Sequence, residues 1–342
     1  MNVVTSAEKL TAKDFATDQE VRWCPGCGDY AILKAMQKAL PELGVTKEGT
    51  VFVSGIGCAA RFPYYMETYG FHTIHGRAPA VATGLKLAQP DLDVWVVSGD
   101  GDALSIGGNH LMHVLRRNVD LNILLFNNRI YGLTKGQYSP TSAPGTKSPS
   151  TPVGSVENPI SAGVFALGAA ARFVARGIDT QSKQLVELFK RAHGHKGASF
   201  VEILQNCIVY ADDVHKHITD KSIAKDSQIL LENGKPLIFG KDNEKGIRIK
   251  PGTLELEVVI IGENGVTEDD LLVHDETNRT VANMLVAMDP PTMPVAIGVI
   301  YCDPTPSYEQ SVVDQIKYAQ EQKGEGTDLN ALLRNGSIWE VS

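Results

Sequence analysis

The sequence lacks any apolar run long enough to cross a membrane. A membrane-spanning helix needs about 20 consecutive apolar residues, and no segment approaches that length. The first residues are polar and contain no apolar stretch typical of a signal peptide, so we expect a cytoplasmic protein. In that reducing compartment structural disulfides are not expected.

The chain also lacks an excess of positive charge. It has 32 Lys and Arg residues against 40 Asp and Glu residues, which gives a formal net charge of −8. Because nucleic-acid binding depends on basic surfaces, we expect no nucleic-acid partner. Hydrophobic residues make up 43% of the sequence, which is enough for a substantial core.

What the sequence does contain is a regular alternation of strand-like and helix-like segments. This alternation predicts an α/β fold with a parallel sheet and helices on both faces. The predicted strands are 51–54, 93–98, 121–126, 173–175 and 200–204, and the predicted helices are 30–40, 78–88, 109–117, 162–171 and 181–193.

Beyond this core the pattern changes. We expect one domain over residues 1–220 and a C-terminal extension over 221–342 that packs on the core or on a partner subunit. Residues 138–159 are rich in Pro, Ser, Thr and Gly, which indicates a functional loop such as a lid or a subunit contact. Residues 220–251 are polar and rich in lysine, and we interpret them as a mobile surface arm.

Two short motifs follow two of the predicted strands. Gly99-Asp100-Gly101-Asp102 ends the first, and Asn127-Asn128 ends the second. Ligands of parallel sheets bind beyond the carboxyl ends of the strands. Mg²⁺ prefers oxygen ligands, which Asp100, Asn128 and the Ile130 carbonyl could supply. The two motifs therefore predict a site for a divalent cation and a diphosphate.

The cysteines indicate a second site. Cys24 and Cys27 form a Cys-x-x-Cys pair, whereas Cys58 and Cys207 each follow a predicted strand. Such thiolate sets bind zinc or an iron–sulfur cluster. A thioredoxin-like redox pair is a weaker alternative, because Cys24 and Cys27 precede the first strand. Cys302 we interpret as a buried small apolar residue.

Together these motifs resemble two known patterns. The Gly-Asp-Gly and Asn-Asn segments resemble the thiamine-diphosphate motif. With the cysteines, residues 15–220 resemble the β subunit of 2-oxoacid:ferredoxin oxidoreductases, most closely those acting on 2-oxoglutarate. The matching segments are 23–28, 54–58, 75–78, 98–102 and 127–137.

The resemblance implies a fold, three cofactors and a set of site residues. The fold is that of a thiamine-diphosphate-binding (diphosphate) domain. Asp100, Asn128 and Ile130 would hold Mg²⁺, while Cys24, Cys27, Cys58 and Cys207 would hold a 4Fe–4S cluster. The residues implied to bind thiamine diphosphate are Ile56, Gly57, Cys58, His75, Gly99, Asp100, Gly101, Asp102, Asn128, Ile130, Tyr131, Gly132, Leu133 and Thr134.

The implied reaction converts 2-oxoglutarate and coenzyme A to succinyl-CoA and CO₂, or the reverse, with electrons passing through the cluster to ferredoxin. The Arg61 guanidinium could hold the distal carboxylate of the substrate, and His75 and Leu133 are the other residues expected near the reacting groups. An Arg61 that pairs with a structural acid is an equal alternative.

The resemblance also implies partners. The activating glutamate and the pyrimidine-side domain have no counterpart in this sequence, so we expect an α subunit to supply them, most simply in an (αβ)₂ heterotetramer. Three other functions remain open: a 2-oxoacid oxidoreductase for pyruvate or another 2-oxoacid, a thiamine-diphosphate enzyme without a cluster, and a zinc-stabilised structural subunit with a vestigial diphosphate site.

Overall fold

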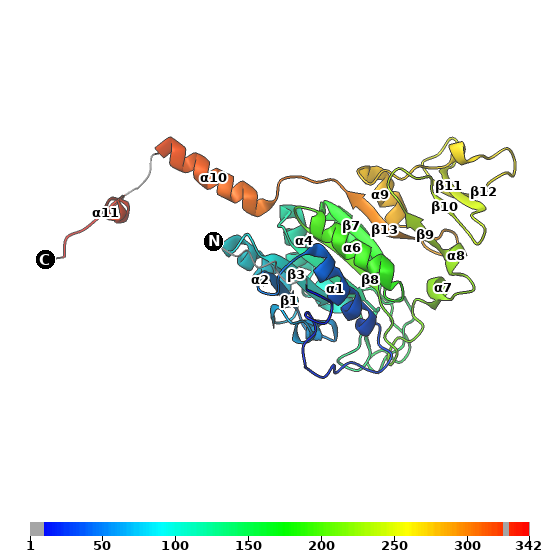
Figure 1. Cartoon of the computed structure of the whole chain (residues 1–342), viewed down its shortest axis with the longest axis horizontal. Helices are drawn as coiled ribbons and strands as arrows, with labels where there is room; N and C mark the ends of the chain where they lie inside the picture. Colours follow the sequence, from blue (N-terminus) through cyan, green and yellow to red (C-terminus); the bar gives the residue numbers. More distant parts are fainter. Residues whose placement is uncertain (1–9, 324–327, 342) are drawn as a thin grey trace, which may run out of the picture.

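A computed structural model describes residues 10–323 and 328–341, and its centre is an eight-stranded sheet (Figure 1). The strand order is β2-β1-β3-β4-β8-β7-β13-β9. The strands are β1 (Thr50–Ser54), β2 (Tyr69–His72), β3 (Asp93–Gly99), β4 (Asn122–Asn127), β7 (Phe173–Ile178), β8 (Ser199–Leu204), β9 (Gln228–Leu231) and β13 (Val295–Cys302).

The predicted α/β architecture is confirmed, with one departure in strand direction. The six strands from β2 to β7 are mutually parallel, but β13 pairs antiparallel with β7, and β9 runs parallel to β13. Every residue of β4, β7 and β8 is buried. Helices cover both faces of these strands. The side chains on both faces are therefore buried, which explains why the strand sequences are nearly continuous apolar runs.

Successive residues of each strand enter two different cores, as the pleat of a strand requires. Trp95 and Val97 of β3 pack with α1 (Asp29–Leu43), α6 (Ser182–Gly194) and the 3₁₀ helix η1 (Ala59–Tyr65). Val94 and Val96 face the opposite layer. The helices of that layer are α2 (Ala78–Ala88), α4 (Gly108–Arg117), α5 (Ala162–Gly168) and α9 (Arg279–Val286).

The residues beyond 220 continue this fold. They supply β9 and β13 to the main sheet and a separate antiparallel sheet in the order β10-β11-β12. The interpretation of residues 220–251 as a mobile arm is wrong, because Ile229, Leu231, Phe239 and Ile247 are buried in a core cluster. The remaining elements here are β10 (Ile238–Phe239), β11 (Lys245–Ile249), β12 (Leu256–Ile260), α7 (Lys216–Thr219), α8 (Ala224–Ser227) and η2 (Glu268–Asp270).

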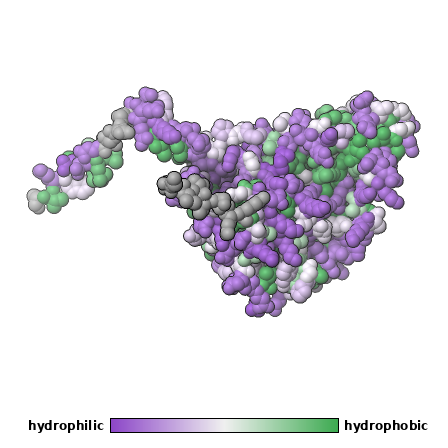
Figure 2. All heavy atoms as spheres, in the orientation of Figure 1, coloured by the Kyte–Doolittle hydropathy of each residue, from purple (hydrophilic) through white to green (hydrophobic). Residues whose placement is uncertain are grey.

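The C-terminal helices leave the body of the molecule. Figure 1 shows α10 (Tyr308–Lys323) and α11 (Leu329–Leu333) extending away from the sheet. In Figure 2 hydrophobic residues lie along this arm, and its exposed aliphatic side chains include Ile316 and Leu332. None of the described helices is both long and apolar enough to span a membrane. The residues that carry the signal-peptide expectation, 1–9, lie outside the described part.

Candidate functional site

The predicted site residues lie at one edge of the main sheet. In the sheet β1 is the neighbour of β3, β3 of β4, and β4 of β8, all in parallel. Their carboxyl ends therefore coincide. This arrangement brings together Cys58 after β1, Asp100 after β3, Asn128 after β4 and Cys207 after β8.

A single cleft at this edge contains every residue that the sequence analysis assigned to cofactor binding. Its lining includes Ile56, Gly57, Cys58, His75, Gly99, Asp100, Gly101, Asp102, Asn128, Ile130, Tyr131, Gly132, Leu133 and Thr134. Asp29, Ala59 and Phe126 complete the lining and had not been singled out. Residues from five separate chain segments, namely 29, 56–59, 75, 99–102 and 126–134, thus share one surface.

Asp100 is the buried carboxylate of the cleft, with 1% of its surface exposed. The hydroxyls of Ser139 and Thr141 each donate to its Oδ2 atom at 2.5 Å. Burial raises the pKa of Asp100, and the two hydroxyl donors oppose this rise. Such donors fix the orientation of a carboxylate that ligates a metal.

Ser139 and Thr141 were missed by the sequence analysis. They reach Asp100 because β5 (Ile130–Tyr131) pairs antiparallel with β6 (Gln137–Tyr138) and returns the chain to the cleft. The hydroxyl-rich segment 139–142, which follows the next predicted loop after the Asn-Asn motif, was the available signal.

The second acidic residue of the motif, Asp102, is fully engaged within the protein. Its carboxylate accepts from the Ser98 hydroxyl at 2.7 Å and the Gly76 amide at 2.9 Å, and it lies 3.1 Å from His75 Nδ1. A Cβ on Gly55 would fall 1.7 Å from Asp102 Oδ2, so only glycine fits there. Asp102 therefore positions the His75 ring at the edge of the cleft.

The loop after β4 adds neutral oxygen atoms. Asn128 Oδ1 accepts from the Ile130 amide at 3.2 Å, and the Tyr131 hydroxyl donates to the Gly101 carbonyl at 3.0 Å. One carboxylate, one amide oxygen and the Ile130 carbonyl in the same cleft fit a hard cation that also takes phosphate oxygens.

The predicted thiols approach one another beside this cleft. A Cβ on Gly132 would lie 3.4 Å from Cys207 Sγ and 3.8 Å from Cys58 Sγ. Burial, Asp29 and the other thiols, Cys207 and Cys24, raise the pKa of Cys58 to about 12. Burial also raises the pKa of Cys27, with contributions from Asp29, Cys58 and Cys207.

These thiols are not arranged around a single ion. Across residues 10–323 and 328–341 no group of three or more His, Cys, Asp or Glu side chains is close enough to hold one metal ion. The assignment of the four cysteines to a cluster therefore stays a prediction.

Arg61 does not line the cleft. It lies in η1, and its Nε atom donates to the Tyr65 hydroxyl at 3.0 Å. Within the described ranges its guanidinium forms no ion pair. The other two nitrogen atoms of its guanidinium fork thus have no carboxylate partner there.

The proteins that this chain resembles in comparisons with known proteins agree with one another. A family model described as the thiamine pyrophosphate enzyme, C-terminal TPP binding domain, matches residues 55–203. The 2-oxoglutarate oxidoreductase subunit KorB of Mycobacterium tuberculosis is 47% identical over 343 residues, covering 99% of this chain and 91% of that protein. The 2-oxoacid:ferredoxin oxidoreductase subunit beta of Sulfolobus sp is 46% identical, covering 61% of this chain and 69% of that protein.

A solved structure extends the likeness to the whole fold. The chain is similar to a 2-oxoglutarate:ferredoxin oxidoreductase from Magnetococcus marinus determined with 2-oxoglutarate, coenzyme A and succinyl-CoA bound, at a TM-score of 0.76 and 32% identity, covering 97% of each chain. On the identity and coverage of the mycobacterial relative, the chain belongs to the family of 2-oxoacid:ferredoxin oxidoreductase β subunits and is a subunit of an oxidoreductase.

Proposed function

We propose that this chain and a partner subunit convert 2-oxoglutarate and coenzyme A to succinyl-CoA and CO₂, with electrons passed through a 4Fe–4S cluster to ferredoxin. The reverse carboxylation would use the same site. Two similarities support this substrate: the mycobacterial relative is named for 2-oxoglutarate, and the Magnetococcus marinus structure holds 2-oxoglutarate and succinyl-CoA.

The observation that carries the proposal is that Cys58 and Gly132 belong to both sites. Both residues line the cleft, and Gly132 also lies against the sulfur atoms of Cys58 and Cys207. A cofactor in the cleft and a cluster on these thiols would therefore be neighbours. Oxidation by single electrons requires such proximity.

The chain's own residues divide the work in the cleft. Asp100, Asn128 and the Ile130 carbonyl would hold Mg²⁺, and Gly99 would leave room for the diphosphate. Thiamine diphosphate, when bound, supplies the electron sink for decarboxylation. Because Asp102 already accepts three internal contacts, its role is to orient His75 rather than to bind the cation.

The thiols would lose their protons when the cluster is assembled. Cys58, with its pKa near 12, is a neutral thiol at physiological pH unless iron binds it. Cys27, whose pKa is raised in the same way, and Cys58 would therefore be stable as thiolates only in the loaded protein.

Substrate recognition is assigned to Arg61, with His75 and Leu133 nearer the reacting groups. Leu133 and His75 both line the cleft, and Leu133 is 55% exposed there. The guanidinium of Arg61 could bind the distal carboxylate of 2-oxoglutarate with the nitrogen atoms that Tyr65 leaves available.

An α subunit would complete the active site by supplying the activating glutamate and the pyrimidine-side domain, in an (αβ)₂ assembly located in the cytoplasm. The described residues contain one domain of the diphosphate type and no second one. This chain is acidic, and ferredoxin is usually acidic as well. Ferredoxin would therefore dock on local lysines of this chain or on the partner subunit.

The test is anaerobic co-purification of both subunits followed by assay. We expect a brown complex with acid-labile sulfide that reduces ferredoxin only when 2-oxoglutarate and coenzyme A are both present. A colourless complex with tightly bound zinc would instead support the structural alternative. A brown complex that uses pyruvate and ignores 2-oxoglutarate would overturn the substrate assignment alone.

A further inference from the structure

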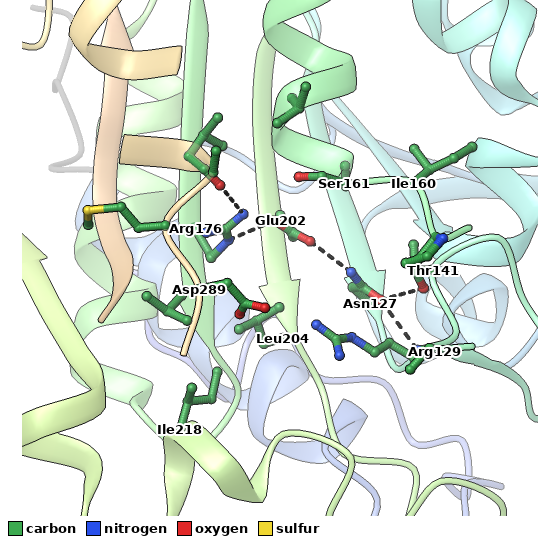
Figure 3. A pocket seen from close by; sticks show the side chains of 18 of the residues that line it. Asn127, Arg129, Thr141, Ile160, Ser161, Arg176, Glu202, Leu204, Ile218 and Asp289 are labelled. Atoms are coloured by element: carbon green, nitrogen blue, oxygen red, sulfur yellow. Dashed lines mark hydrogen bonds and ion pairs between the residues drawn. The ribbon is translucent and has the colours of Figure 1, made fainter. Parts of the chain in front are cut away.

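A second cavity of about 470 Å³ opens further along the same sheet edge, beyond β4, β8 and β7 (Figure 3). Its walls come from the loop around 141–161, from the carboxyl ends of these strands, and from the segment between α9 and β13. Small-molecule sites in proteins have about this volume. Nothing in the proposed reaction uses this cavity.

The floor of the cavity is a closed polar network. Arg176 Nε donates to Glu202 Oε2 at 2.8 Å, and Asn127 Nδ2 donates to Glu202 Oε1 at 2.7 Å. Both charged residues are buried, with 7% and 4% of their surfaces exposed. Because these charges satisfy each other, the floor offers no free charge to a ligand.

Arg129 differs from these residues in its backbone conformation and in the position of its side chain. Its φ angle is +56°, in the left-handed region that side chains other than glycine rarely adopt. Its amide donates to Asn127 Oδ1, and its carbonyl accepts from the Ser142 hydroxyl. These two bonds hold the strained backbone and direct the guanidinium into the cavity (Figure 3).

Asp289 faces Arg129 but does not pair with it. In Figure 3 the carboxylate of Asp289 and the guanidinium of Arg129 extend toward each other from opposite walls. Neither residue forms an ion pair within residues 10–323 and 328–341. The structure thus holds one positive and one negative group apart across a ligand-sized space.

The remaining walls limit what could fill this space. They are mostly apolar, with Ile160, Leu204, Ile218, Met288 and Val295 among them. At the rim, burial and the charge of Arg129 lower the pKa of His217, while the carboxylate of Asp289 opposes them; the net lowering favours the neutral ring over a second cation. One cation, one anion and an apolar wall do not suit a phosphate-rich molecule.

We propose that this cavity binds a small zwitterion of the α-amino-acid type. Its carboxylate would pair with Arg129, its ammonium group with Asp289, and a hydrophobic side chain would lie on the apolar wall. The site is separate from the diphosphate cleft: Thr141 Oγ1 stands between them, 2.5 Å from Asp100 Oδ2 and 3.0 Å from Asn127 Oδ1.

Calorimetric titration of the purified complex tests the site with three probes of equal apolar body. L-leucine carries both charges, 4-methylpentanoate lacks the ammonium group, and 3-methylbutylamine lacks the carboxylate. We expect saturable binding of L-leucine, weakened at least about tenfold for each truncated probe, since each loses one charged contact.

Two variants and a matched control locate the binding. Arg129→Gln and Asp289→Asn should each weaken L-leucine binding by about tenfold or more. Arg172→Gln should leave it unchanged, because Arg172 pairs with Asp303 outside the cavity. Thermal melting verifies that each variant is folded. Absence of saturable L-leucine binding, or binding that both cavity variants retain, would overturn the proposal.

Discussion

The thiols of Cys58 and Cys207 meet beside Gly132, although they follow β1 and β8, which are not neighbours in the sheet. The loop after β4 carries Gly132, so the segment that lines the diphosphate cleft also touches two predicted cluster ligands. This contact joins the two halves of the site through one small residue.

Gly132→Ala should therefore reduce the cluster content. The added methyl group would lie 3.4 Å from Cys207 Sγ and 3.8 Å from Cys58 Sγ, beside the two thiols that would hold the cluster, and would compete with it for space. Iron and acid-labile sulfide, measured after anaerobic purification, should fall well below the wild-type values. Gly84→Ala is the matched control, since no atom lies within 4 Å of its added Cβ. Full iron content in Gly132→Ala would place the cluster elsewhere.

The fourth ligand can be tested separately. Cys207→Ala should abolish the visible absorption of the cluster, whereas Cys302→Ala should retain it. Cys302 is paired with Phe173 at the start of β7, so it lies at the amino-terminal end of the parallel strands. The cleft lies at their carboxyl ends. The sulfur of Cys302 is 3.9 Å from His195 Nδ1. Equal loss of the cluster in both variants would show that the effect is a general loss of folding.

Arg61→Ala tests substrate recognition. If the guanidinium binds the distal carboxylate, steady-state assays should show a large increase in KM for 2-oxoglutarate, on the order of 10-fold or more for a lost charge-assisted pair. The KM for any residual turnover of pyruvate, which has no distal carboxylate, should be unchanged. Tyr65→Phe serves as a control that loosens the Arg61 side chain without removing its charge. Equal effects of Arg61→Ala on both substrates would assign Arg61 a structural role.

The main sheet and the cleft could be predicted because they depend on local patterns. The runs before Asp100 and Asn128 are short, apolar and followed by glycine or asparagine, and parallel strands bring such ends together. All residues that the family resemblance implied for cofactor binding line one cleft. Arg61 does not, because the 3₁₀ helix after Cys58 turns its side chain toward Tyr65.

Other features depend on contacts that a sequence pattern does not contain. Ser139 and Thr141 reach Asp100 only through the β5-β6 hairpin. The antiparallel direction of β13 has no local signature, because the residue pattern of an apolar strand does not depend on the strand's direction in the sheet. Residues 220–251 are rich in lysine, and this composition made the alternating buried residues of β9 to β11 hard to recognise in the sequence.

The ion pair between Arg176 and Glu202 predicts a strong effect on stability. Burial alone would raise the pKa of Glu202, but Arg176 and Asn127 outweigh this and hold the pKa below its usual value. Arg176→Met leaves a buried carboxylate without its cation, which should lower the free energy of unfolding by about 3–5 kcal/mol. Urea denaturation of the full-length chain measures this loss. The double variant Arg176→Met/Glu202→Leu should recover most of it, and failure to do so would mean that packing rather than charge dominates.

Acid should destabilise the protein partly through His215. Burial and the nearby charge of Arg129 lower the pKa of His215 to about 4, whereas an unfolded histidine titrates near about 6.5. In the neutral ring Nε2–H donates to the Asn127 carbonyl at 2.9 Å. The folded state therefore binds fewer protons than the unfolded state between these two values. Stability from this group is complete above about pH 6.5 and is lost as the pH falls toward the folded-state pKa, by about 3 kcal/mol in total.

His215→Gln separates this contribution from those of the other histidines. The glutamine amide can still donate toward Asn127 but does not titrate, so the pH dependence of the unfolding free energy should become shallower by up to one proton over this range. Urea denaturation at several pH values gives both slopes. Because His215 Nδ1 has no hydrogen-bond partner within the described part of the chain, protonation there places an uncompensated charge in a buried site. An unchanged slope in the variant would show that water or Glu202 stabilises the protonated ring in the folded protein.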